Sequence, residues 1–188
     1  MDTDELDFTL ETVKEGMDDA IERLQKELAK VSAGKANPAM VKDLIVEYYG
    51  SPSTISKIAN VQIADARTIA IQPWEKSMLA PIERAIFEAN LGVTPMNDGE
   101  MVRINIPPLT TERRKDLVKR VRALGEDAKV SVRSERQKAM SAIKSAVKDG
   151  YPEDAGKRTE EAVEADMKAY YAKVEKLLDV KEKDVMTV

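Results

Sequence analysis

The chain has 188 residues and a net charge of −4, with 34% of its residues charged and only 4% aromatic. It contains no cysteine and no histidine, which excludes disulfides, thiolate metal sites and every nucleophile that depends on a histidine base. Carboxylates and lysines remain as catalytic groups, but no carboxylate pair stands out by its spacing. We therefore expect no catalytic residue, no metal site and no cofactor.

The first segment is predicted to be a helix, because apolar or small residues recur at spacings of four and three from Leu6 to Val31. The middle segment has a different period. Apolar residues alternate with other residues near positions 44–49, 61–63, 69–71 and 102–106, which indicates strands. Residues 78–90 form one amphipathic helical pattern. The middle of the chain is therefore predicted to be a small α/β unit. In it, Tyr48 and Tyr49 are expected to be strand aromatics, one packed and one half-exposed, and Trp74 is expected to pack at the edge of the sheet.

Pro107 and Pro108 end the strand pattern, and Thr110 follows as a predicted helix N-cap. A helical pattern of nearly forty residues comes next, with Gly125 inside it at a cost of about 1 kcal/mol relative to alanine. After a turn at 149–152, a last helix is expected to run to about position 184, with a seam of apolar residues at Val163, Met167, Tyr170, Val174 and Leu177.

Three long helices with one apolar seam each must bury their seams against one another. The fold class is thus expected to be α+β, with a long antiparallel three-helix bundle formed by residues 1–30 and 106–188. The small α/β domain of residues 31–105 is inserted between the first two helices. Its two connections predict a hinge at Val31, Lys35, Asn105, Pro107 and Pro108.

Positive charge is concentrated on the second long helix. Residues 110–148 contain twelve basic and five acidic residues, a local net charge of +7, so the rest of the chain carries −11. Helical spacing places several of the basic residues along one edge, namely Lys115, Lys119, Arg122, Lys129, Arg133, Arg136 and Lys144. An edge of this kind is typical of a solvated bundle face or of a surface that binds RNA phosphates, and geometry alone leaves both open.

Three stretches resemble the ribosome recycling factor family, and the similarity extends over nearly the whole chain in order and length. They are Ile104-Asn105-Ile106-Pro107-Pro108-Leu109-Thr110-Thr111-Glu112-Arg113-Arg114, Val46-Glu47-Tyr48-Tyr49-Gly50-Ser51-Pro52 and Val132-Arg133-Ser134-Glu135-Arg136. The resemblance implies an L-shaped arrangement of the two domains. It also implies a translation factor that, with elongation factor G and GTP, releases and splits post-termination ribosomes from mRNA.

The resemblance also implies contacts to large-subunit RNA. Arg133 and Arg136 match paired arginines of the family, and Arg114 matches a further basic position. With Arg122 and Lys129 from the basic edge, these are the expected RNA-binding residues. The chain departs from the family pattern at Gln137, where a second arginine is common, and at Ser32-Ala33-Gly34-Lys35, where Arg-Thr-Gly-Arg is frequent.

The expected partners are the large ribosomal subunit with its RNA and elongation factor G, with no membrane partner. The expected location is the cytoplasm, because the N-terminus is acidic and no apolar run has the length of a membrane span. The protein is also expected to be a monomer. Two other classes of protein stay open from the residues alone. One is a helical scaffold that binds only proteins, and the other is an enzyme that uses carboxylates of the α/β domain.

Overall fold

The computed structural model describes residues 2–31 and 33–187, which separate into two compact units. One contains the residues up to Leu28 together with Val118–Lys183, and the other contains Ala29–Leu117 together with the residues from Asp184 onward. The predicted α+β class is confirmed, since a long helical part accompanies a small antiparallel sheet. The functional division at positions 30/31 and 105/106 stays a prediction.

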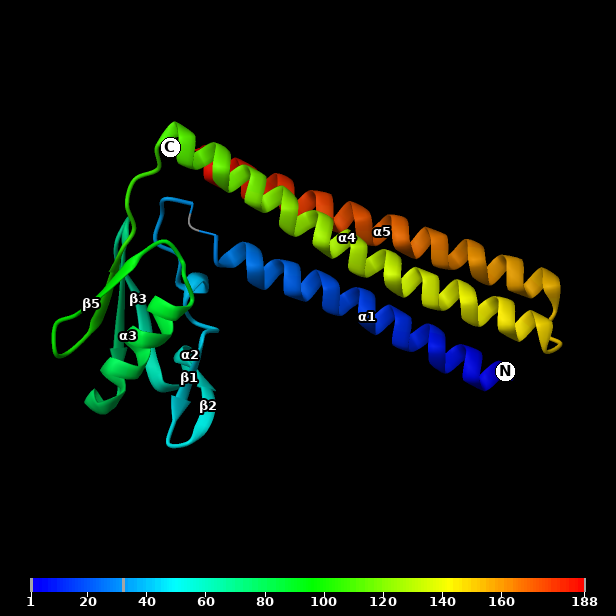
Figure 1. The fold of residues 1–188 in the computed structure, drawn as a ribbon, viewed down its shortest axis with the longest axis horizontal. Helices are drawn as coiled ribbons and strands as arrows, with labels where there is room; N and C mark the ends of the chain where they lie inside the picture. The colour runs from blue at the N-terminus through cyan, green and yellow to red at the C-terminus, as the bar shows by residue number, and fades with distance from the viewer. Residues whose placement is uncertain (1, 32, 188) are drawn as a thin grey trace. The chain divides into compact units, whose positions relative to one another are not determined.

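The helical unit is built from three long helices, as the sequence predicts. They are α1 (Thr3–Ala29), α4 (Thr111–Lys148) and α5 (Glu153–Met186). In Figure 1 the colours show that α4 runs antiparallel to both α1 and α5. Their shared core includes Leu6, Met17, Val132, Ile143 and Tyr170.

The start of α4 confirms the predicted N-cap. Thr110 Oγ1 accepts a hydrogen bond of 3.1 Å from the backbone N–H of Arg113, which satisfies one of the free amides of the first turn. At the start of α1, Asp2 and Glu5 each accept a hydrogen bond from the other's backbone N–H, at 2.8 and 3.2 Å. Side chains therefore define the start of both helices.

Glycines allow the helices of this unit to approach closely. A Cβ at Gly125 would lie 2.3 Å from Leu178 Cδ1, and one at Gly16 would lie 2.5 Å from Glu135 Cδ. The glycine inside α4 is therefore the place where a leucine of α5 packs against the helix. The predicted α5 seam is wrong at this point, because Leu178 is buried and Leu177 is only half-buried.

The small unit contains two antiparallel sheets. A hairpin pairs β1 (Ile45–Tyr48) with β2 (Ser51–Thr54). The four-stranded sheet has the order β3-β4-β6-β5, formed by β3 (Ala59–Asp65), β4 (Thr68–Pro73), β6 (Val102–Asn105) and β5 (Thr94–Asn97). The strands predicted near 44–49, 61–63, 69–71 and 102–106 are present, whereas β2 and β5 were not predicted.

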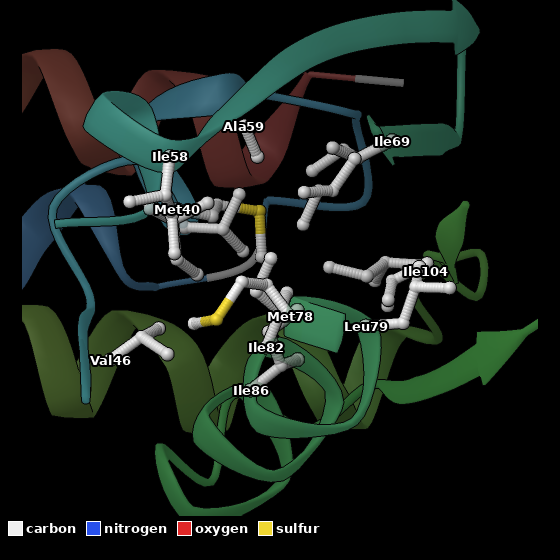
Figure 2. Close-up of a cluster of buried hydrophobic side chains, with 14 of the residues drawn as sticks. Met40, Val46, Ile58, Ala59, Ile69, Met78, Leu79, Ile82, Ile86 and Ile104 are labelled. Atoms are coloured by element: carbon white, nitrogen blue, oxygen red, sulfur yellow. The ribbon is translucent and has the colours of Figure 1, made fainter. Parts of the chain in front are cut away.

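Helix α3 (Leu79–Glu88) forms most of the helix predicted at 78–90. It is preceded by a 3₁₀ turn, η2 (Lys76–Met78), and two further short elements are η1 (Pro38–Met40) and α2 (Ile55–Ile58). Figure 2 shows Ile82 and Ile86 of α3 in one apolar cluster with Ile69 and Ile104 of the sheet. The expectation that Trp74 packs at the sheet edge is wrong, because its side chain is 70% exposed.

Candidate nucleic-acid interface

Helix α4 carries all five basic residues that the sequence marks for RNA contact, and four of them, Arg122, Lys129, Arg133 and Arg136, lie in the helical unit. Spacings of seven, four and three residues keep them on one side of the helix. We call these four residues the basic row. Ion pairs show that α5 lies beside this row, so the surroundings of each cation depend on the residues that α5 presents.

Arg122 is held by three carboxylates of α5. Its Nη1 lies 3.1 Å from Glu175 Oε2, and its Nη2 lies 3.4 Å from Asp179 Oδ1. Glu182 accepts hydrogen bonds from both Nε and Nη2, the latter at 2.8 Å. Hydrogen bonding to Glu182 raises the pKa of Arg122 further above its ordinary value. One cation among three carboxylates leaves the local charge negative.

Lys129 contacts α5 through an ion pair and an aromatic ring. Its Nζ lies 2.5 Å from Glu175 Oε1 and 5.7 Å from the centre of the Tyr171 ring. Glu126 of α4 lies 3.8 Å away. The hydrogen bond to Glu175 raises the pKa of Lys129, and the same bond lowers the pKa of Glu175. Glu175 thus links two members of the basic row.

Arg136 makes a similar pair further along the bundle. Its Nε donates a hydrogen bond of 2.6 Å to Glu164 Oε1, and its Nη2 donates to the same oxygen. Three of the four cations in the basic row are therefore bound to carboxylates of α5.

Arg133 differs from its neighbours. It is exposed, and it has no ion-pair partner within residues 2–31 and 33–187. Between Glu164 and Glu175, α5 presents Lys168 and Tyr171 toward α4: Lys168 lines a groove together with Arg136, and the Tyr171 ring contacts Lys129. The acid in this stretch, Asp166, lies on another face, where it lines a groove with α1.

The basic row continues into an open groove of about 640 Å³ between α4 and α5. Both helices contribute cations to this groove, Lys144 from α4 and Lys157 from α5. Its acids, among them Glu160 and Glu161, all come from α5. The cations of α4 are thus opposed by acids of α5 along this groove as well.

Arg114 lies in the other unit and has different surroundings. It is half-buried, its Nη1 donates a hydrogen bond of 3.5 Å to the carbonyl of Met186, and its Nε is buried without a partner among the described residues. A contact of Arg114 with RNA stays a prediction.

The predicted hinge residues belong to the unit that contains the sheet. Val31 is buried, whereas Asn105, Pro107 and Pro108 are exposed. Lys35 Nζ lies 4.0 Å from Asp184 Oδ1. Ser32, where the chain departs from the family pattern, lies outside the described residues.

Two backbone features surround these segments. Gly34 has a φ of +78°, and a Cβ there would lie 3.0 Å from Leu109 Cγ. Ile106 is buried and its backbone N–H donates a hydrogen bond of 2.7 Å to the Arg67 carbonyl. These observations describe the packing of the two segments, and their role as a hinge stays a prediction.

A cluster that the sequence did not predict joins Tyr48, Tyr49 and Glu75. The Tyr48 hydroxyl donates a hydrogen bond of 2.8 Å to Glu75 Oε1, and the Tyr49 hydroxyl donates one of 2.5 Å to Oε2. These bonds lower the pKa of Glu75 and raise the pKa of both phenols. Because Glu75 lies 26 residues from Tyr49, no local pattern points to this contact.

No group of three or more acidic side chains is placed to hold a metal ion within residues 2–31 and 33–187. None of the described helices is long and apolar enough to cross a membrane.

The sequence is similar to proteins of one known family. The model of the family described as ribosome recycling factor matches residues 24–186. The ribosome-recycling factor of Christiangramia forsetii is 50% identical over 98% of this chain and all of its own length, and that of Flavobacterium psychrophilum is 46% identical over 99% of this chain and all of its own length.

Two solved structures are also similar. The solution structure of a ribosome recycling factor has a TM-score of 0.79 and 33% identity, with full coverage of both chains. The T. thermophilus ribosome recycling factor, described with E. coli elongation factor G bound to the E. coli post-termination complex, has a TM-score of 0.64 and 37% identity. It is matched over 97% of this chain and 99% of that chain.

The fold and the basic row define an α+β protein in which a three-helix bundle presents a charged edge. The matched family and relatives cover almost the whole of this architecture. The chain belongs to the ribosome recycling factor family.

Proposed function

We propose that this protein is a translation factor that works with elongation factor G and GTP to release and split post-termination ribosomes from mRNA. Family membership supports the proposal, as does the similarity to a recycling factor that is described with elongation factor G on a post-termination complex. On this proposal the protein acts as a monomer in the cytoplasm, where it makes no covalent bond and binds no nucleotide itself.

The bundle is the proposed ribosome-binding part, and its contacts with large-subunit RNA involve Arg114, Arg122, Lys129, Arg133 and Arg136. The observation that carries this proposal is Arg133, an exposed guanidinium in the basic row with no carboxylate partner among the described residues. Such a group is free to make a charge-assisted hydrogen bond to a phosphate or to stack on a base.

The inserted domain of residues 31–105 is the proposed point of engagement for elongation factor G. Movement of this domain about Val31, Lys35, Asn105, Pro107 and Pro108 would transmit the partner's motion to the bundle. The two consecutive prolines support this role, because each fixes φ and so limits how far the connection bends.

The experiment compares wild type with Arg133→Ala. Post-termination ribosomes are mixed with elongation factor G, GTP and either protein, and subunit release is followed by light scattering. Arg133→Ala should weaken ribosome binding about 5- to 150-fold, the equivalent of about 1–3 kcal/mol for one lost charged contact, with unchanged helicity. Equal binding by the two proteins would contradict the role of Arg133.

A second measurement separates this proposal from a scaffold that binds only proteins. Ribosome binding should fall steeply with salt, because phosphate contacts release counterions. Failure of the wild-type protein to release subunits would contradict the proposed function as a whole.

A further inference from the structure

The carboxylates of α5 that face α4 have no task in the function proposed above. Glu164, Glu175, Asp179 and Glu182 all lie against cations of the basic row. Carboxylates at these positions work against the binding of RNA phosphates to the cations of α4, so a surface built only for RNA affinity would not contain them.

The pairing between the helices is selective. Arg122, Lys129 and Arg136 each have a carboxylate oxygen within 3.1 Å, whereas Arg133 has no such neighbour in the part of the chain that the structure describes. In the stretch of α5 between Glu164 and Glu175, the charged residue that lines the groove beside Arg136 is Lys168. This lysine adds positive charge to the groove instead of neutralising it.

Two physical effects follow from the contacts of the paired cations. A guanidinium or ammonium group that is bound to a carboxylate must give up that hydrogen bond before it binds a phosphate. In addition, the carboxylates repel the phosphates. Around Arg122 and Lys129 the acids Glu175, Asp179 and Glu182 outnumber the cations.

We infer that these α5 carboxylates are specificity determinants that mask Arg122, Lys129 and Arg136 from RNA in general and leave Arg133 as the open contact. The inference rests on the proposed function, since it takes RNA as the ligand. Sequence-independent RNA affinity increases with every cation that neutralises a phosphate. Masking keeps this sequence-independent part of the RNA affinity small. Binding then depends on an RNA site that accommodates Arg133. As a consequence, the factor does not remain on unrelated RNA between rounds of recycling.

The test uses the triple variant Glu175→Gln/Asp179→Asn/Glu182→Gln, which removes the acids around Arg122 and Lys129. The matched control is Asp7→Asn/Glu11→Gln/Glu15→Gln, which changes the net charge equally. These three acids of α1 are exposed, with no ion-pair partner among the described residues. The probe is an RNA duplex of about 20 base pairs with no ribosomal sequence, and its binding is measured by fluorescence anisotropy between about 50 and 200 mM salt.

The triple variant should bind the duplex about tenfold more tightly than wild type at the lower salt concentration. Its plot of log affinity against log salt should be steeper by about 1.8, because two freed cations each neutralise one phosphate. The control should keep the wild-type slope, since its charges change away from these cations and are screened over about 10 Å. Equal changes in slope for the triple variant and the control would overturn the inference.

A smaller substitution keeps the test valid if the triple variant loses helicity. Glu164→Gln frees Arg136 alone, and Glu15→Gln in α1, exposed and with no ion-pair partner within the described residues, is its control. The first should steepen the slope by about 0.9 and the second should not. Identical slopes would overturn the inference. Ribosome binding by the wild-type protein tests the proposed function separately, so a failure of the masking inference can be distinguished from a failure of the proposed function.

Discussion

Replacing Gly125 with alanine measures how much of the bundle's stability depends on the close approach of α4 and α5. The new Cβ would lie 2.3, 2.9 and 3.0 Å from Cδ1, Cδ2 and Cγ of Leu178. Leu178 is only 2% exposed, so its whole side-chain end must move within a packed core. Such overpacking costs about 1–3 kcal/mol.

An opposing effect acts on the helix itself, since alanine is favoured over glycine by about 1 kcal/mol inside a helix. Three atoms within 3.0 Å place the overpacking cost near the upper end of its range. We therefore expect Gly125→Ala to lower the free energy of unfolding by about 1–2 kcal/mol, which corresponds to a fall in Tm of about 2–8 °C for a chain of this size.

Gly16→Ala is the matched control. Its Cβ would meet the carboxyl end of Glu135, a flexible side chain that is 18% exposed and is able to rotate away. Gly16→Ala should therefore be neutral or stabilising by up to about 1 kcal/mol. Guanidinium unfolding followed by far-UV circular dichroism measures both variants. If Gly125→Ala is as stable as Gly16→Ala, with equal m values, the packing argument is refuted.

Three further predictions concern other parts of the molecule. Glu75→Gln should bring the raised pKa of Tyr49 back toward 10, as followed by phenolate absorbance. A Tyr49 titration unaffected by this substitution would contradict the hydrogen bond to Glu75. Because the pKa of Glu75 is lowered on folding, the stability that Glu75 contributes should be present above its ordinary pKa of 4.5 and lost as pH falls through the folded value. Arg122→Ala should lower Tm by leaving Asp179 and Glu182 without their cation and Glu175 with Lys129 alone, and an unchanged Tm would show that the ion pairs of Arg122 add no stability. Pro107→Gly/Pro108→Gly should preserve ribosome binding but slow subunit splitting, and unchanged splitting despite a wider spread of interdomain distances would contradict the hinge.

The long helices could be predicted because their seams have a regular period and their ends have specific signals. Thr110 is one such signal, and the structure shows its side chain capping α4. Strands β2 and β5 lacked such a pattern, since each is four residues long and contains a proline, Pro52 and Pro95 respectively. Both lie where a missing backbone donor is tolerated, β2 in a two-stranded hairpin and β5 at the edge of its sheet.

The basic row shows that the residue pattern of one helix does not predict which side chains of a neighbouring helix will contact it. The spacing of Arg122, Lys129 and Arg136 placed them on one edge, but their partners depend on the register between α4 and α5, which only packing decides. The spacing of Glu164, Glu175 and Glu182 is a usable signal, since intervals of eleven and seven residues keep them on one face of α5. A row of acids on one helix and a row of bases on another predicts that the two rows meet.

The gap that the missing side chain of Gly125 leaves in α4 also affects how the two helices resist sliding along their axes. The acids around Arg122 succeed one another at intervals of about one helical turn, 5.4 Å, so a slip by one turn would exchange Glu182 or Glu175 for another carboxylate at little cost. Leu178 has no equivalent place to go, because the next turn of α4 toward its start presents Val121 instead of a gap. Arg122 therefore keeps a carboxylate neighbour after such a slip whereas Leu178 loses its gap, so the missing side chain at Gly125 helps to fix the axial position of α5 against α4.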